Sequence, residues 1–465
     1  MVANRAIIDY AQNYQYVPSN IDPNWICVGP SNTPVNNDYR GVGQIHRIAF
    51  DPNYGISNQI VYASSGFGGL WRSEDDGSNW VNVNTDQLPM TTVADVAVCP
   101  TNGNILYIGT GLPDGGVNLT YSSNWTAINP IFTIGVYRST DYGATWHSIN
   151  EGLIDDFYTN GGVIRKMEID KYNPDIIIMA TSNGVYKTSN ALATNPEWTK
   201  IFDGFTDDDN DFRVVKYKPG SSNVMYAASN NIFKSADGGT TWASMTGPTT
   251  GLDFNSLLPF MPYRINLAVT PANSERVYAS IWGLSNGATK LYLYYYNGTN
   301  WILIFSGQGT YAKEWMGLAV SPVNPDEYYF YGKQGEGLMG SKSLTVSPTV
   351  KGQYSSNSGT YADGHVVEFQ PNILNNPLLF YGHHGGISVG NTSPSEVPLW
   401  EKRNNGLANL LLWSFDDSEF HKDVIVAAKQ DHYCDIYRGG QWFALPGGGD
   451  SYSVKTAKSN DSLFF

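Results

Sequence analysis

Short apolar segments in which hydrophobic and polar positions alternate recur along almost the whole chain. They come in groups of four, separated by turns rich in Gly, Asn, Asp and Pro. Period-two segments of this length predict β-strands, and four strands in each repeat of about 40 to 50 residues are typical of propeller blades. The sequence therefore predicts an all-β fold, a β-propeller of seven or eight four-stranded antiparallel blades. The first strands of the eight units are expected at 46–52, 93–100, 164–174, 212–219, 264–271, 315–322, 365–371 and 410–417.

Three units share one turn of the form Ser-x-Asp-x-Gly-x-x-Trp. The Asp carboxylate is suited to accept backbone N–H groups of its own turn, and the Gly allows a positive φ. The Trp then lays a large ring over the turn as the return strand begins. We expect each copy to join the third strand of a blade to the fourth. The residues concerned are Ser73, Asp75, Gly77 and Trp80, then Ser139, Asp141, Gly143 and Trp146, then Ser235, Asp237, Gly239 and Trp242.

The two ends of the chain differ from the repeats. Residues 1–23 form an N-terminal extension, and the following segment 24–30 is predicted to be an outer strand that pairs with the far end of the chain and closes the ring. The propeller is placed at 24–445. Residues 446–465 look like the start of a further repeat that is cut short, so the chain is expected to be part of a longer multidomain protein.

The octapeptide turns resemble the Asp-box, or bacterial-neuraminidase repeat, of sialidases, sortilin-type receptors and xyloglucan hydrolases. The segments 41–52 and 68–77 also resemble sortilin-type and xyloglucanase-like propellers of large secreted Bacteroidetes proteins. This resemblance implies a secreted or cell-surface β-propeller. It does not separate enzymes from binding proteins, because the box is a structural device that both classes use.

The composition of the chain argues against some classes of binding partner. Among 465 residues the formal net charge is −14, which argues against nucleic acid or an anionic membrane as a partner. No apolar run has the length of a membrane span, and the N-terminus lacks the apolar core of a leader peptide. We expect an extracellular or cell-surface protein whose leader is absent from this chain.

Three widely spaced cysteines have no metal-ligand spacing and are expected to be buried as small hydrophobes.

Ligand binding is predicted on the face opposite the Asp-boxes, where polysaccharide or protein would bind. Tyr121 and Trp125 lie in a long insertion there and are candidate stacking platforms, or they pack the loop onto its blade. Cationic residues near the start of several first strands are expected to converge on the central channel and bind an anion, unless each pairs with a local acid. These residues are His46, Arg165, Arg213, Arg264 and His365.

Metal and acid–base chemistry have weaker signals. Asp207, Asp209 and Asp211 form a dense acidic stretch that suits calcium, the one cofactor that the sequence suggests, although such runs are more often solvated turns. The pairs His383–His384 and Asp431–His432 offer imidazole for a metal or for proton transfer. They lie one unit apart.

Catalysis is doubtful at the position where the resemblance would place it. Residues 62–69 resemble a xyloglucanase segment, but the position of that segment's catalytic Asp is Gly66. Glycoside hydrolysis needs two carboxyl groups, and Gly supplies none. The sequence therefore names no catalytic residue and favours a non-catalytic binding module for glycan or protein. The alternatives are a xyloglucanase- or sialidase-like hydrolase with rearranged acids, and a structural scaffold in a larger assembly.

Overall fold

The structure is a computed structural model. It describes residues 29–31, 34, 41–113, 133–153, 162–206, 209–257, 260–309, 316–332, 337–352, 359–361, 363–391, 399–421, 423–457 and 460–464. Over these ranges the fold is all-β, and the prediction of four-stranded antiparallel sheets is confirmed: eight such sheets are present. Each keeps its strands in the order of the sequence.

The first four sheets correspond to the four clearest sequence repeats. The first contains β1 (Arg47–Phe50), β2 (Val61–Ser65), β3 (Gly69–Ser73) and β4 (Val81–Asn82), and the second β5 (Val93–Val98), β6 (Leu106–Thr110), β7 (Val136–Ser139) and β8 (His147–Ser148). The third contains β9 (Ile164–Ile169), β10 (Ile177–Thr181), β11 (Gly184–Thr188) and β12 (Thr199–Phe202), and the fourth β13 (Val214–Tyr217), β14 (Met225–Ala228), β15 (Ile232–Ser235) and β16 (Ala243–Ser244).

The later sheets follow the looser repeats. The fifth contains β17 (Phe260–Thr270), β18 (Asn273–Ser285), β19 (Ala288–Tyr296) and β20 (Trp301–Gly307), and the sixth β21 (Leu318–Val320), β22 (Tyr328–Phe330), β23 (Leu338–Ser341) and β24 (Thr349–Gly352). The seventh contains β25 (Gly364–Phe369), β26 (Leu379–His383), β27 (Gly386–Gly390) and β28 (Trp400–Lys402), and the eighth β29 (Leu412–Asp417), β30 (Ile425–Lys429), β31 (Tyr433–Arg438) and β32 (Gln441–Ala444). A last hairpin pairs β33 (Thr456–Ala457) with β34 (Asn460–Phe464).

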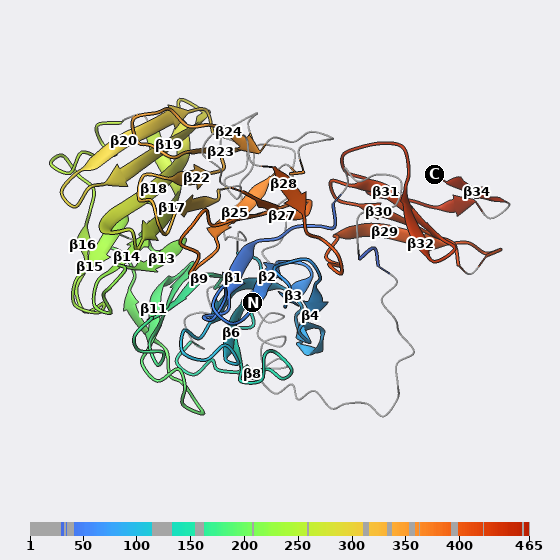
Figure 1. The fold of residues 1–465 in the computed structure, drawn as a ribbon, viewed down its shortest axis with the longest axis horizontal. Helices are drawn as coiled ribbons and strands as arrows, with labels where there is room; N and C mark the ends of the chain where they lie inside the picture. The colour runs from blue at the N-terminus through green and yellow to red at the C-terminus, as the bar shows by residue number, and fades with distance from the viewer. Residues whose placement is uncertain are drawn as a thin grey trace.

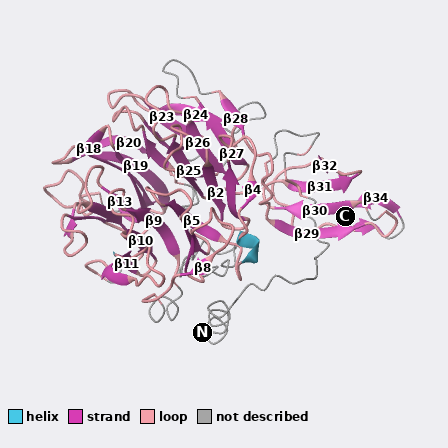
Figure 2. Cartoon of the chain, turned by 60° about the horizontal axis from the view of Figure 1, so that its bottom comes forward, coloured by secondary structure: helices cyan, strands magenta, loops and turns pink. Residues whose placement is uncertain are grey.

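Seven of the sheets surround a common centre, and the eighth lies to one side (Figures 1 and 2). The first strands of neighbouring sheets contact one another in the order β1, β5, β9, β13, β17, β21 and β25, and β25 contacts β1. The second strands β2, β10 and β26 are buried over their whole length. The apolar faces of adjacent sheets therefore form the core between them.

The octapeptide turns lie between third and fourth strands, as predicted. In the first, the Ser73 hydroxyl donates to Asp75 at 2.8 Å and accepts the Gly77 N–H at 2.8 Å, and the Asn79 N–H donates to Asp75 at 2.8 Å. The second and third turns repeat this pattern. Gly77 has φ +83°, a conformation that Gly adopts without steric cost.

Tryptophans at the beginning of fourth strands join several sheets to the one before. Trp146 Nε1 donates to the carbonyl O of Val83 at 2.9 Å, and Trp198 Nε1 donates to Ile149 at 2.9 Å. Trp301 and Trp400 make the same contact with the sheets that precede theirs. Trp242 differs: its ring stacks on Phe202 of the preceding sheet at 4.9 Å, and its N–H bonds Gly239 in its own turn.

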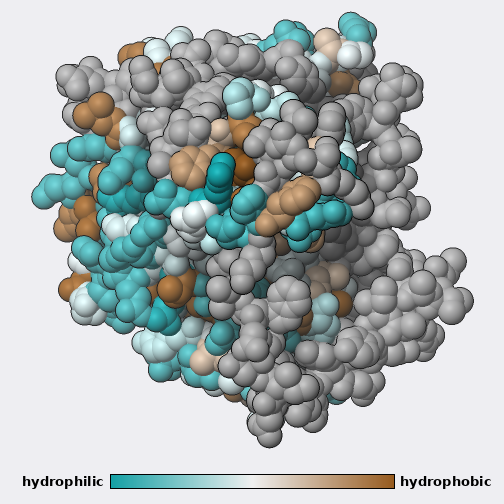
Figure 3. Space-filling model, turned by 90° about the vertical axis from the view of Figure 1, so that its right-hand side faces the viewer, coloured by the Kyte–Doolittle hydropathy of each residue, from teal (hydrophilic) through white to brown (hydrophobic). Residues whose placement is uncertain are grey.

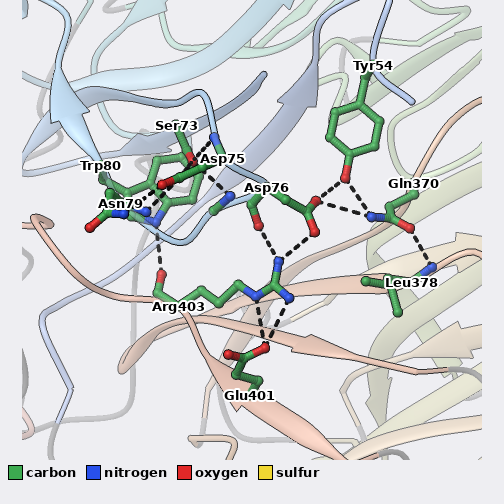
Figure 4. Close-up of polar contacts among 11 residues, drawn as sticks. Tyr54, Ser73, Asp75, Asp76, Asn79, Trp80, Gln370, Leu378, Glu401 and Arg403 are labelled. Carbon is green, nitrogen blue, oxygen red and sulfur yellow. Dashed lines mark hydrogen bonds and ion pairs between the residues drawn. The ribbon is translucent and has the colours of Figure 1, made fainter. Parts of the chain in front are cut away.

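The junction of the first and seventh sheets has the densest polar network of this kind (Figure 4). Trp80 Nε1 donates to the carbonyl O of Arg403 at 2.9 Å, and the Arg403 guanidinium bonds Asp76 at 2.7 Å. Asp76 also accepts the Tyr54 hydroxyl and the Gln370 amide. The predicted N-terminal outer strand that would also close this junction stays a prediction, because residues 24–28 lie outside the described ranges.

The eighth sheet has its own small core, which includes Val426, Ala428 and Val454. Its first strand leaves Leu412, Trp413 and Phe415 exposed, the last by 69%. Figure 3, viewed from this side of the molecule, shows apolar side chains scattered among polar ones. The one helical segment in the described ranges is η1 (Thr85–Gln87), a single 3₁₀ turn, so none there reaches the length and apolarity needed to cross a membrane.

Candidate functional site

Histidine and aspartate side chains gather where the first, seventh and eighth sheets meet. His46 precedes β1, and Asp363 and His365 lie at the start of β25. His384 lies in the turn between β26 and β27, and Asp431 lies in the turn between β30 and β31. These turns join second strands to third strands, so the cluster lies at the opposite end of the strands from the octapeptide turns.

The side chains form a continuous chain of contacts. The His46 and His365 rings lie 4.4 Å apart between centroids, and His365 Nε2 lies 3.0 Å from His384 Nε2. On its other side, His384 Nδ1 lies 2.5 Å from Asp431 and 3.6 Å from Asp363. His384 is therefore held between an imidazole and two carboxyl groups that come from different sheets.

The pKa values of the two carboxyl groups shift in opposite directions. Burial is the main cause that raises the pKa of Asp363 to about 6. The charge of His384 opposes this shift only in part, and the negative charges of Asp431 and Asp450 add to it. Burial acts in the same direction on Asp431, but the hydrogen bond from His384 outweighs it and the pKa of Asp431 falls below its usual value. Burial lowers the pKa of His384, yet Asp431 and Asp363 more than compensate and the net shift is upward.

Two further histidines support the cluster and stay neutral. Burial lowers the pKa of His383 well below its usual value, and burial together with Lys429 lowers that of His432 to about 3. His432 Nε2 lies 3.0 Å from the carbonyl O of His384, and His432 Nδ1 accepts the Gly41 N–H at 3.3 Å. These contacts tie the eighth sheet to the seventh and to the segment before β1.

Both acids are held in an uncommon backbone conformation. Asp363 has φ 60° and Asp431 has φ 59°, in the left-handed region, which Asp tolerates better than most residues. Asp431 is fixed by Asp450, which accepts its N–H at 2.8 Å, and by the Tyr361 hydroxyl, which donates to its carbonyl O at 2.8 Å. Such constrained backbone is often found at ligand-binding and catalytic sites.

Gly66, the position of the missing acid, lies beside this cluster. Its N–H donates to His46 Nδ1 at 3.0 Å, and the His46 ring packs on His365. A Cβ atom at residue 66 would lie 3.1 Å from the His46 ring and 2.6 Å from the Leu112 side chain. The chain therefore fills the space near residue 66 with imidazole and leucine, and the carboxyl groups of Asp363 and Asp431 lie beyond the rings of His46, His365 and His384.

The same groups offer ligands for a metal. One nitrogen of His384 and one oxygen each of Asp363 and Asp431 lie within 4.8 Å of one another. One imidazole and two carboxylates suit Zn²⁺ or Mn²⁺ better than Ca²⁺, which prefers oxygen ligands alone. His365 would then act as the outer hydrogen-bond partner of His384.

The cations predicted near the channel separate into two groups. His46 and His365 join the cluster described above, whereas Arg165 and Arg213 share Asp211 at 3.1 and 2.6 Å. Arg213, Arg264 and His365 line a cavity at the centre of the sheets. The anion binding predicted for these residues stays a prediction.

The predicted calcium ligands and stacking aromatics have different outcomes. Both oxygens of Asp211 are hydrogen-bonded to arginine, which disfavours calcium there, and Asp209 accepts the Thr206 hydroxyl at 3.2 Å. Asp207, Tyr121 and Trp125 lie outside the described residues, so their roles stay predictions.

Sequence reasoning had singled out His383–His384 and Asp431–His432 but had missed Asp363. The available signal was its position two residues before His365, at the start of a first strand. Period-two patterns cannot show that the turn of one sheet and the entry to another come together. That information depends on how the sheets are placed around the centre.

Comparisons with known proteins agree with this architecture. No family model matches the chain. A xyloglucanase of Paenibacillus sp. is 29% identical over 225 residues, covering 44% of this chain and 20% of the relative. Xyloglucanase Xgh74A of Acetivibrio thermocellus is 26% identical over 223 residues, covering 46% of this chain and 21% of the relative.

Solved structures show the same fold over a longer range. The GH74 enzyme of Niastella koreensis matches with a TM-score of 0.65 at 20% identity, covering 93% of this chain and 64% of that one. The GH74 xyloglucanase of Xanthomonas campestris matches with a TM-score of 0.59 at 14% identity, covering 92% and 71%. The chain spans about a fifth of the length of the curated relatives that it matches. It therefore has a β-propeller fold like that of these enzymes and is similar in sequence to xyloglucanases over less than half of its length.

Proposed function

We propose that this chain is the propeller part of a polysaccharide-directed glycoside hydrolase of the xyloglucanase type, in which Asp363 and Asp431 supply the acids. The observation that carries the proposal is the convergence of these two carboxyl groups on His384, in the histidine cluster whose His46 end contacts Gly66. The similarity to xyloglucanases favours this alternative over the non-catalytic module that the sequence alone had favoured.

The proposed roles follow from the two environments. A pair of carboxyl groups whose pKa values are driven apart is suited to acid–base chemistry on a glycosidic bond. Asp363, with a pKa of about 6, would protonate the leaving oxygen. Asp431 stays ionised through its hydrogen bond with His384 and would be the second carboxylate. Side-chain exposures of 20% and 26% leave both groups accessible to a substrate.

The test is hydrolysis of xyloglucan and other β-glucans by the purified protein, measured as new reducing ends. Asp363→Asn and Asp431→Asn should each lower the rate at least about a hundredfold. The control is Asp326→Asn, a 45% exposed carboxylate that pairs with Arg276 between the fifth and sixth sheets. Circular dichroism and melting curves establish that each variant is folded. Equal activity of native protein and Asp363→Asn would overturn the assignment.

A metal would change the interpretation of the same residues. Activity that persists in EDTA supports the acid–base assignment. Activity lost in EDTA and restored by a divalent cation would mean that Asp363, His384 and Asp431 act as ligands instead.

Gly66 favours a second candidate, a glycan-binding module without catalysis. It predicts that the native protein retains xyloglucan in an affinity gel without producing reducing ends. In both cases we propose that the protein acts outside the cell, because a polysaccharide cannot reach an internal enzyme. We also propose that further sheets of a longer chain cover the exposed strand β29.

A further inference from the structure

A cavity of about 300 Å³ lies at the centre of the seven sheets, lined mainly by their first strands. Its charged lining is strongly one-sided: a single acid, Glu368, and five basic residues, namely Arg47, Lys166, Arg213, Lys216 and Arg264. This contrasts with the whole chain, whose net charge is −14. The basic residues of the first, third, fourth and fifth sheets are therefore concentrated at this point.

One buried carboxylate serves two of these cations. Asp95, which has no exposed surface, lies 3.5 Å from Arg47 and 3.2 Å from Lys166. The same carboxylate accepts the Met167 N–H at 2.6 Å. Asp95 therefore serves both cations with one negative charge, and the Glu368 carboxyl group of the seventh sheet faces the same two cations.

Arg213 is in a similar position. Its partner Asp211 is shared with Arg165, so again one carboxylate serves two guanidinium groups. The side chain of Arg213 is only 8% exposed, and its Nη1 has no hydrogen-bond partner among the described residues. A buried N–H without a partner is costly, so an acceptor in the cavity would relieve it.

Lys216 completes the basic wall. It pairs with Glu168, and although burial opposes the shift, Glu168 and Glu368 raise its pKa above the usual value, so it remains charged. Glu368 faces Lys216, Lys166 and Arg47 from the seventh sheet. Lys216 keeps 21% of its side chain exposed, Lys166 15% and Arg47 12%, so solutes have access to these groups.

We propose that the central cavity is a binding site for a small dianion, an oxyanion or a short dicarboxylate, held by Arg213, Lys166 and Lys216. The volume suits a ligand of this size, since it is at the lower end of ligand pockets. Five basic residues against the single acid Glu368 in the lining, together with the Nη1 of Arg213 that has no partner among the described residues, favour an anionic ligand. Guanidinium and ammonium groups are the side chains best suited to bind carboxylate and oxyanion oxygens.

Binding is tested by calorimetric titration of the whole protein with sulfate, phosphate and succinate at constant ionic strength. The variant is Lys166→Gln/Arg213→Gln, which removes two of the three proposed ligand-binding cations, while Asp95 still pairs with Arg47 and Asp211 still pairs with Arg165. We expect saturable binding to the native protein and a loss of at least about tenfold in affinity in the variant. The control is Lys187→Gln in the third sheet, whose Nζ donates to Gly238 at 2.8 Å and does not line the cavity.

The three anions distinguish the ligand class. Preference for succinate identifies a dicarboxylate site, and preference for sulfate or phosphate identifies an oxyanion site. A melting temperature of the native protein that rises with the preferred anion, but not with chloride at equal ionic strength, is a second readout that needs no variant. Absence of saturable binding of all three anions, or unchanged affinity in the double variant, would overturn the proposal.

Discussion

Trp80 Nε1 donates a hydrogen bond of 2.9 Å to the carbonyl O of Arg403, which joins the first sheet to the seventh across 323 positions of sequence. The Trp80 ring is 3% exposed and belongs to the core between these sheets. The N–H of Trp80 stabilises the junction through a hydrogen bond, and its ring stabilises the junction through apolar packing. Different substitutions can therefore remove the two contributions separately.

Replacing Trp80 tests both contributions. Trp80→Phe keeps an aromatic ring but leaves the Arg403 carbonyl without its donor, so unfolding free energy should fall by about 1 to 2 kcal/mol. Trp80→Ala also loses the buried ring and should cost about 3 to 5 kcal/mol. Urea unfolding measures both. Trp242→Phe is the control, because the N–H of Trp242 bonds its own turn; equal losses in the two Phe variants would contradict the assignment.

Glycines after several fourth strands lie against the backbone of a tryptophan in the next sheet. Gly251 has φ +80°, and a Cβ there would lie 2.4 Å from the Trp301 carbonyl O. Gly251→Ala should therefore destabilise by clearly more than the roughly 1 to 2 kcal/mol that a left-handed conformation costs an L-residue. Gly220, with φ +84° and no atom within 4 Å of its Cβ position, is a matched control. Similar melting temperatures for the two Ala variants would mean that the backbone at Trp301 yields easily.

The octapeptide turns predict a loss of stability in acid. Hydrogen bonds from Thr241 and Ser235 hold the pKa of Asp237 at about 2, below the value of about 3.9 of an unfolded chain. Between these values the unfolded chain binds more protons, so stability is present above pH 4 and is lost as the pH falls towards 2. Urea midpoints at pH 5 and pH 3 should fall more for the native protein than for Asp237→Asn. Thr241→Val keeps the carboxylate, loses one hydrogen bond and should give an intermediate slope.

The eighth sheet contains an ion pair with no exposed surface, formed by Lys429 and Asp435. Lys429→Met would leave Asp435 as an uncompensated buried charge and should cost about 3 to 5 kcal/mol. The double variant Lys429→Met/Asp435→Leu should regain most of this loss, because both charges are then absent. Urea unfolding followed by the fluorescence of Trp442, in the same sheet, measures the effect. If the double variant is no more stable than the single one, the pair contributes more than mutual neutralisation.

The strands were predictable because their physics is local. The apolar segments 46–52 and 93–100 marked two first strands, although β5 is buried at five of its six positions and shows no alternation in burial, and the octapeptide turns marked the passage from third to fourth strands. A second repeated signal was missed. Gly152, Gly251 and Gly406 each precede a buried Leu. Each of these glycines has a positive φ and lies against the backbone of a Trp in the next sheet, which explains why glycine recurs before the Leu.

The candidate site was only partly predictable because it is assembled from three sheets. His46, His365 and His384 carry no common spacing, and Asp363 and Asp431 are brought together by the placement of the eighth sheet beside the seventh. The use of Asp211 by two arginines also needed coordinates, since the acidic stretch by itself looked like a cation site.

The contact of β1 with β25 has a consequence for synthesis. A ribosome completes the first sheet early, yet its partner arrives only after residue 407, when Gly406 and Leu407 can pack beside Trp80. Until then the nascent chain presents an unprotected apolar surface at its N-terminal blade. The yield of folded protein should therefore depend more on chaperones, or on pausing late in translation, than on the stability of any single early strand.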